Sequence, residues 1–253
     1  MEVRDKVVAI TGAARGLGQE FAKSLAAAGV HIVAADIRDC AGTLELVAAE
    51  KRGRGIATRL DVTDPGSARA MVEAAVSAFG KLDALINNAA LYGALHGGRF
   101  DAIDEAEWDA CMAVNVKGIW NCCKAAVPAM RQAGGGSIVN IASLAATYGM
   151  PYGLHYTTSK AAVIGLTRGL ARELGRDRIR VNALAPSAVM TEGTREFFGP
   201  KLDRALDAIK TSQTIQRNLV PSDLVGTVMW LVSDASGFVT GQTIAVDGGT
   251  VML

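Results

Sequence analysis

Short apolar runs rich in β-branched residues alternate along this chain with longer segments of helical periodicity. Strands separated by helices form βαβ units, which place parallel strands in one sheet with helices on both faces. The sequence therefore predicts an α/β fold, a single-domain doubly wound parallel sheet of about seven strands. The predicted strands are Lys6–Thr11, His31–Ala35, Gly55–Asp61, Ala84–Asn87, Ser137–Ala142, Ile179–Ala183 and Thr243–Val246. The predicted helices are Leu17–Ala28, Ala41–Arg52, Pro65–Phe79, Glu105–Ala133, His155–Arg176 and Pro221–Ser233.

An irregular insertion, residues 187–216, separates the sixth predicted strand from the last predicted helix. It contains Phe197 and Phe198 and one further expected short helix, Lys201–Lys210. In open parallel sheets, ligands bind beyond the carboxyl ends of the strands, and the insertion begins just after the carboxyl end of the sixth predicted strand. We therefore expect it to cover a substrate; the alternative is a variable surface excursion.

Charge and composition exclude several classes of protein. The chain has 253 residues and a net charge of +1, which gives no field to attract nucleic acid or an anionic membrane. It has neither an apolar run long enough to span a bilayer nor the layout of a signal peptide at its start. Its histidines do not cluster, so we expect no metal site. The cysteines lack C-x-x-C spacing and predict reduced thiols in a cytoplasmic protein: Cys40, Cys111, Cys122 and Cys123.

The first predicted strand runs into a glycine-rich turn, TGAARGLG, and then into a helix. Gly12, Gly16 and Gly18 would let the backbone approach a pyrophosphate, and the start of the helix would offer it free N–H groups and a positive dipole. Their spacing is G-x-x-x-G-x-G rather than the G-x-G-x-x-G of the common dinucleotide fingerprint. The turn predicts a dinucleotide site; the alternative is a glycine-rich turn without a ligand.

Asp36 follows the second predicted strand, where its carboxylate could bind an adenosine ribose diol and repel a 2′-phosphate. Arg15 and Arg38 favour the opposite choice, because either could pair with that phosphate. We expect the carboxylate to prevail and predict NAD rather than NADP. Asp61 could reach the adenine or cap a strand end, and the asparagines of NNAA could tie neighbouring strands together.

Tyr156 and Lys160 lie four residues apart in a predicted helix, so they share one helix face. A nearby ammonium favours phenolate over phenol and is expected to lower the pKa of Tyr156 from about 10. Such a tyrosine could exchange protons near neutral pH, as alcohol–carbonyl chemistry requires. The alternative is a pair of side chains on a solvated helix face.

Taken in order, the motifs TGAARGLG, Asp36, Asp61-Val62, NNAA, Asn115, Ser143, YTTSK and GQTIAVDGG resemble those of the short-chain dehydrogenase/reductase family over essentially the whole chain. The resemblance implies a Rossmann fold and a catalytic set. In that set Tyr156 would be the general acid/base, and Lys160 would hold the nicotinamide ribose and depress the tyrosine pKa. Ser143 would bind the substrate oxygen, and Asn115 would position a water that links Lys160 to solvent.

The resemblance also implies which residues hold the cofactor. Two positions depart from the usual family pattern: Ala90 ends NNAA, where glycine is usual, and Ser187 follows Pro186, where glycine is also usual. The second departure puts the carboxamide contact in doubt. The implied cofactor residues are Gly12, Arg15, Gly16, Leu17, Gly18, Asp36, Ile37, Asp61, Val62, Asn88, Ala89, Tyr156, Lys160, Pro186, Val189 and Thr191.

The residues that the resemblance places around the reacting carbon are mostly apolar, which suits a hydrophobic or aromatic secondary alcohol or ketone. They are Ser143, Leu144, Ala145, Tyr92, Met150, Tyr152 and Met190, with Phe197 and Phe198 as further candidates. We expect His155 to line the pocket wall and His96 to be exposed. Core packing would explain most of these residues equally well.

Two other functions remain open at this point. A 3-oxoacyl-thioester reductase would use NADPH, which Arg15 favours and Asp36 disfavours. A non-catalytic dinucleotide sensor would lack Tyr156 or Lys160, and both are present. The helical segments Glu105–Ala133 and His155–Arg176 carry apolar residues on more than one face, and the family commonly forms homotetramers through these helices and the C-terminal segment.

Overall fold

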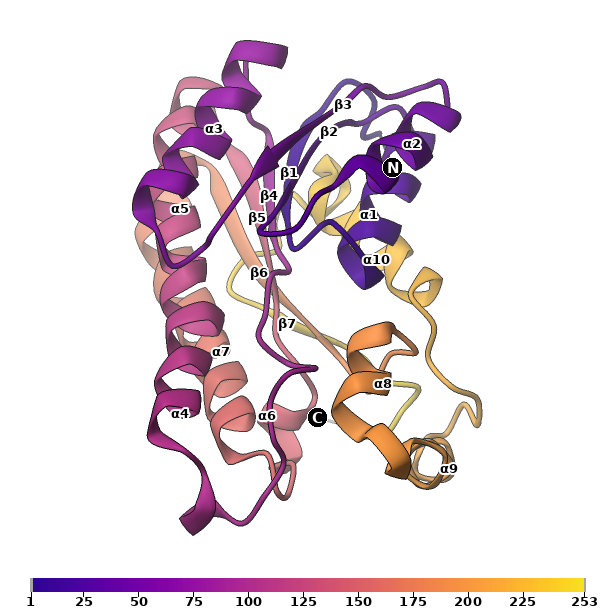
Figure 1. Ribbon diagram of the computed structural model, residues 1–253. Coiled ribbons are helices and arrows are strands. Elements are labelled where there is room, and N and C mark those ends of the chain that lie inside the picture. Colours follow the sequence, from indigo (N-terminus) through magenta and orange to yellow (C-terminus); the bar gives the residue numbers. More distant parts are fainter. Residues whose placement is uncertain (1, 253) are drawn as a thin grey trace.

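Seven parallel strands form one sheet in the computed structural model, which describes residues 2–252 (Figure 1). The strand order is β3-β2-β1-β4-β5-β6-β7, and every neighbouring pair is parallel, which confirms the predicted α/β fold. The sixth strand is longer than predicted and the third is shorter. The strands are β1 (Val7–Thr11), β2 (His31–Asp36), β3 (Gly55–Arg59), β4 (Ala84–Asn87), β5 (Gly136–Ile141), β6 (Ile179–Pro186) and β7 (Thr243–Val246).

Helices cover both faces of the sheet (Figure 1). One face packs against α1 (Gly16–Ala27), α2 (Ala41–Ala49) and α10 (Ser222–Val232). The other packs against α3 (Pro65–Phe79), α5 (Gly118–Gln132) and α7 (Leu154–Leu174). Each face therefore has its own apolar core, because helices cover both sides of the central strands. None of the helices within residues 2–252 combines the length and the apolar character needed to cross a membrane.

The predicted helix Glu105–Ala133 is interrupted near its middle. It consists of α4 (Glu105–Met112), a π-helical turn (Ala113–Lys117) and α5. The wider π turn buries Asn115, whose side chain bonds to the backbone of Leu91. Such turns often occur at functional sites. Sequence periodicity did not reveal the turn, since one extra residue hardly changes an apolar pattern.

The insertion contains one helix that was not predicted. The helix α8 (Glu192–Phe198) follows β6, and a 3₁₀ turn (Gly199–Lys201) leads into α9 (Leu202–Ser212), which is the expected short helix. A second unpredicted helix, α6 (Ala145–Tyr148), follows β5. The remaining short 3₁₀ turns are Phe100–Ala102, Gly175–Asp177 and Asp234–Ser236.

Candidate active site

A cavity of about 990 Å³ extends along the carboxyl ends of the strands. It begins beside Gly12 after β1 and Asp36 at the end of β2, and continues past Ser143 after β5 to Pro186 at the end of β6. β1 pairs with β2 on one side and β4 on the other, so chain order reverses beside it. Ligands of open α/β sheets bind at such a switch point.

The glycine-rich turn packs tightly around its own backbone. Gly12 has a φ of +67°, and a Cβ there would lie 2.8 Å from the Cα of Ala89. A Cβ on Gly18 would collide with the carbonyl oxygen of Gly12. Both glycines are therefore required by close packing, and Gly18 serves this packing from outside the cavity lining.

The start of α1 borders the cavity through Arg15, Gly16 and Leu17. Within residues 2–252, no side chain caps this helix and its first turn carries no acidic residue. The positive end of the helix dipole is thus left uncompensated beside the cavity. This arrangement suits an anionic ligand such as a pyrophosphate.

Asp36 and Asn88 fix the loops at this end of the cavity. The Asp36 carboxylate accepts hydrogen bonds from the backbone N–H groups of Ala14 (3.0 Å) and Arg38 (2.9 Å). The Asn88 amide donates to the carbonyl oxygens of Thr11 (3.0 Å) and Gly12 (2.9 Å). The expectation that asparagines of NNAA tie adjacent strands together is therefore confirmed.

Asp61 lies beyond β3, which ends at Arg59 rather than at Asp61 as predicted. Its carboxylate accepts hydrogen bonds from the N–H (2.9 Å) and hydroxyl (2.7 Å) of Thr63, and these bonds lower the pKa of Asp61. The side chain thus caps a turn, and both Asp61 and Val62 line the cavity. The strand stops early because the chain must turn here to begin α3.

Ser143, Tyr156 and Lys160 meet at the other end of the cavity. Tyr156 and Lys160 lie on α7 and are almost fully buried. The Lys160 ammonium donates a hydrogen bond to the carbonyl oxygen of Ile141 (2.8 Å) and lies 5.6 Å from the centre of the Tyr156 ring. The Ser143 hydroxyl oxygen accepts a bond from the Ala145 N–H (3.2 Å), so its proton can be donated toward the Tyr156 oxygen.

The expected lowering of the Tyr156 pKa is not found. Burial raises the pKa of the phenol well above its usual value, the neighbouring Tyr92 raises it further, and a hydrogen bond with Ser143 acts against both. Burial also lowers the pKa of Lys160 to about 8. The pair is on one helix face as predicted, but desolvation disfavours the charged form of each group and decides the direction of both pKa shifts.

Asn115 stands behind the cavity. Its amide oxygen accepts from the Leu91 N–H (2.7 Å), and its amide nitrogen donates to the Leu91 carbonyl oxygen (3.1 Å) and the Ser159 hydroxyl (3.1 Å). Ser159 lies next to Lys160 in α7. Asn115 therefore joins the loop after β4 to the helix that carries Tyr156 and Lys160.

Comparison with known proteins agrees with this architecture. Residues 12–251 match the family described as Enoyl-(Acyl carrier protein) reductase. An uncharacterised oxidoreductase of Mycobacterium tuberculosis is 41% identical over 98% of both chains. The chain is a short-chain dehydrogenase/reductase. The 3-oxoacyl-[acyl-carrier-protein] reductase FabG of Thermotoga maritima is 36% identical over 100% of both chains. The carveol dehydrogenase of Mycobacterium avium, solved in complex with NAD, is 33% identical over 98% of both chains, with a TM-score of 0.91.

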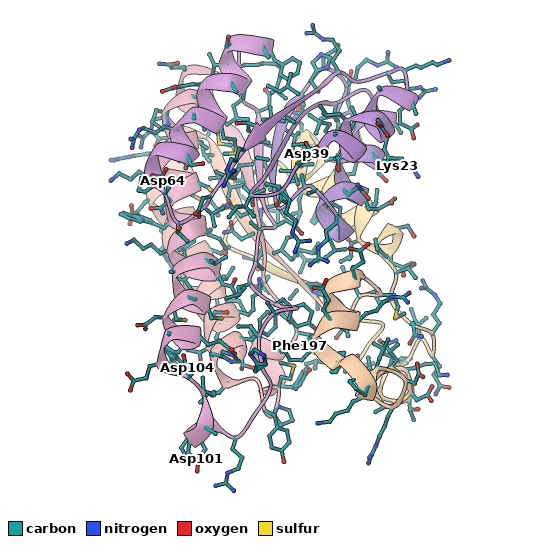
Figure 2. The ribbon with its side chains drawn as sticks, viewed as in Figure 1. Lys23, Asp39, Asp64, Asp101, Asp104 and Phe197 are labelled. Carbon is teal, nitrogen blue, oxygen red and sulfur yellow. The ribbon has the colours of Figure 1, made fainter. Side chains whose placement is uncertain are left out.

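An aromatic stack forms one wall of the cavity in this dehydrogenase/reductase. The ring of Tyr92, in the loop after β4, lies 4.9 Å from that of Tyr156 and 4.6 Å from that of Phe197. Phe197 lies on the side of α8 that faces the rest of the molecule (Figure 2). The stack thus connects the insertion directly to Tyr156, and burial raises the pKa of the Tyr92 phenol to about 12.

Most of the predicted site residues lie on the cavity, and several lie elsewhere. Tyr152 is 69% exposed and borders a separate shallow hollow with Phe100. Met190, Asn115 and Gly18 are outside the cavity lining. The predicted residues that line it are Gly12, Arg15, Gly16, Leu17, Asp36, Ile37, Asp61, Val62, Asn88, Ala89, Tyr92, Ser143, Leu144, Ala145, Met150, Tyr156, Lys160, Pro186, Val189, Thr191, Phe197 and Phe198.

The two histidines near the site bind one carboxylate rather than a substrate. His155 is fully buried, and its Nε2 lies 2.8 Å from Glu107 of α4. The prediction that His155 lines the pocket wall is therefore wrong. His96 is exposed as expected, and its Nδ1 lies 2.7 Å from the same carboxylate. Burial acts to raise the pKa of Glu107, but hydrogen bonds from both histidines outweigh it and keep that pKa below its usual value.

Several residues that line the cavity were not predicted, and two of them are charged. Glu192 and Glu196 lie one turn apart on α8, line the cavity and form ion pairs with Arg15. Their spacing in EGTREFF is the only sequence signal, and it does not identify Arg15 as the partner because that residue is far away in the chain. Apolar residues of α9 were also missed and line the same wall: Ala205, Ala208 and Ile209.

Proposed function

We propose that this dehydrogenase/reductase interconverts a secondary alcohol and a ketone with NAD. One observation carries the proposal: a single cavity joins a glycine-rich helix start and Asp36 to the cluster of Ser143, Tyr156 and Lys160. The first end suits a pyrophosphate and an adenosine ribose, and the second suits a reacting oxygen. When bound, the nicotinamide supplies or accepts the hydride.

In this proposal Tyr156 moves the proton at the substrate oxygen. Its raised pKa keeps the phenol protonated at neutral pH, which suits proton donation to a carbonyl during reduction. Ser143 donates a hydrogen bond to the same oxygen and stabilises the charge that develops there. Lys160 uses one N–H for the Ile141 carbonyl oxygen and keeps two for the nicotinamide ribose hydroxyls.

The proposed preference for NAD rests on Asp36. Its carboxylate is held beside the glycine-rich turn by two backbone N–H groups, so a 2′-phosphate brought there would meet a fixed negative charge. The NAD-bound structure of the related carveol dehydrogenase supports this preference. Pro186, Val189 and Thr191 border the cavity near Ser143 and are proposed to hold the nicotinamide end.

We propose a hydrophobic or aromatic substrate, covered by the insertion (residues 187–216) of a single-domain chain. Around Ser143 and Tyr156 the cavity is lined mainly by apolar and aromatic side chains from four segments. Such a lining favours an uncharged apolar ligand. The residues concerned are Tyr92, Leu144, Ala145, Met150, Phe197, Phe198, Ala208 and Ile209.

A substrate and cofactor panel tests the proposal. Secondary alcohols, including aryl-alkyl carbinols, are supplied with NAD or NADP. Ketones and a 3-oxoacyl thioester are supplied with NADH or NADPH. In each assay the absorbance of the reduced cofactor is followed. We expect turnover of apolar secondary alcohols with NAD, and at least about tenfold lower kcat/KM in a Ser143→Ala variant. Faster turnover of the thioester with NADPH would instead support a reductase like FabG. Cofactor binding with no turnover on any substrate would indicate a sensor.

We also propose a homotetramer. Apolar residues were expected on more than one face of the helices that contain Ile119 and Val163, and these two residues lie in the core. Trp120 of α5, in contrast, is 45% exposed. Phe238 and Met252, near the C-terminus, are exposed as well. Exposed large apolar side chains on α5 and the C-terminal segment are available for burial between subunits. Light scattering is expected to give four times the chain mass of 26.3 kDa; the mass of one chain would contradict this proposal.

A further inference from the structure

Arg15 of the glycine-rich turn is bound by two carboxylates from the insertion. Its guanidinium forms a two-pronged pair with Glu196, through Nη1 to Oε1 and through Nη2 to Oε2 (2.8 Å). Nη1 also donates to Oε2 of Glu192 (3.1 Å). A two-pronged guanidinium–carboxylate pair is the strongest common ion-pair geometry, because both hydrogen bonds are charge-assisted. Three of the five N–H donors of the guanidinium are therefore bonded to carboxylates, and its positive charge is compensated.

These groups lie where the cavity meets Asp36. Asp36, Arg38, Glu192 and Glu196 all line it, and Arg38 helps Arg15 to lower the pKa of Glu196, so its charge is also close. Three carboxylates thus face two guanidinium groups in this part of the cavity. A 2′-phosphate would add close to two negative charges to a region that already has an excess of one.

We propose that Glu192 and Glu196 determine cofactor choice by occupying Arg15. Arg15 and Arg38 are the two cations in this region that could pair with a 2′-phosphate, and Arg15 is the one already paired with both glutamates. To bind the phosphate, Arg15 would have to leave Glu192 and Glu196 while the phosphate approaches three carboxylates. Selection for NAD then comes from two sources: repulsion by Asp36 and the neutralisation of Arg15 by α8. This inference rests on the proposed cofactor site and adds α8 to its specificity.

The test uses two nucleotides that differ only by the 2′-phosphate, 5′-AMP and 2′,5′-ADP, with dissociation constants measured by calorimetry. In the Glu192→Gln/Glu196→Gln variant we expect the affinity for 2′,5′-ADP relative to 5′-AMP to rise by about tenfold. Glutamine keeps the side-chain shape and removes the charge, so the fold should be retained, as a thermal melt will verify. Adding Arg15→Gln to the double variant should abolish the gain, because the released guanidinium produces it.

A matched control removes the same charge from the neighbouring helix. Asp203 and Asp207 are exposed, lie one turn apart on α9, and have no contact with Arg15 within residues 2–252. The Asp203→Asn/Asp207→Asn variant should leave the relative affinity unchanged. An unchanged ratio in the glutamate variant, an equal gain for both nucleotides, or a gain that survives Arg15→Gln would each overturn the inference. Failure of the unmodified enzyme to bind 5′-AMP would remove the proposed cofactor site itself.

Discussion

Replacing Tyr156 with phenylalanine is expected to lower the rate of carbonyl reduction by a factor of about 10² to 10⁴ and to leave NADH binding nearly unchanged. Phenylalanine keeps the ring that packs against Tyr92 and removes only the hydroxyl that is proposed to move the proton. Steady-state rates and a fluorescence titration with NADH measure the two effects separately. The matched control is Tyr152→Phe, since Tyr152 lies outside the cavity and is 69% exposed.

In the unmodified enzyme, the rates of alcohol oxidation and of carbonyl reduction should change in opposite directions as pH rises. Burial raises the pKa of Tyr156, so the phenol stays protonated into the alkaline range. Alcohol oxidation needs the phenolate and should accelerate as pH rises, whereas reduction needs the phenol and should slow at the same alkaline limit. Normal turnover in the Tyr156→Phe variant would refute the role of this residue.

Replacing Lys160 with methionine is expected to remove nearly all turnover and to weaken NADH binding by about tenfold or more, because the charged donors proposed for the nicotinamide ribose are lost. Methionine keeps an unbranched chain of similar length within the core. The variant Lys23→Met is the control, since Lys23 lies on α1, is partly exposed and is outside the cavity lining. Unchanged NADH affinity in the Lys160 variant would exclude the ribose contact.

The same variant should change how stability depends on pH. Burial lowers the pKa of Lys160 to about 8 in the folded protein, from 10.5 in the unfolded chain. Between these values the unfolded chain binds the proton and the folded protein does not, so folding becomes more favourable as pH rises. Relative to the Lys160→Met variant, the free energy of unfolding of the unmodified enzyme should rise by about 3 kcal/mol between neutral pH and about pH 10.5. Urea denaturation at each pH measures the difference in unfolding free energy between the two proteins. A difference that stays constant with pH would contradict this prediction.

The sheet and its helices could be predicted because their signals are local. Helix α3 begins where the sequence placed it, since Asp64 accepts hydrogen bonds from the N–H groups of Gly66 (2.8 Å) and Ser67 (3.1 Å) just before a first-turn proline. β4 and β7 have their predicted bounds because short apolar runs are bracketed by turn residues. The positions of Ser143, Tyr156 and Lys160 around one cavity follow from this topology.

Features that depend on distant contacts could not be predicted. Helix α8 has only seven residues, too few for an apolar period, and its partners Arg15 and Tyr92 are remote in the chain. The pKa of Tyr156 was misjudged for a related reason: the sequence shows that Lys160 is near, but not that both side chains are buried. Burial is a property of the assembled fold, and here it decides the sign.

Helix α8 contacts both ends of the cavity, through Glu196 at Arg15 and through Phe197 at Tyr92. The proposed contribution to cofactor choice and the proposed contact with the substrate are therefore carried by the same short helix. Directed evolution that reshapes this stretch for a bulkier alcohol should shift the coenzyme preference at the same time. Natural relatives that diverged here would be expected to change both traits in step rather than one after the other.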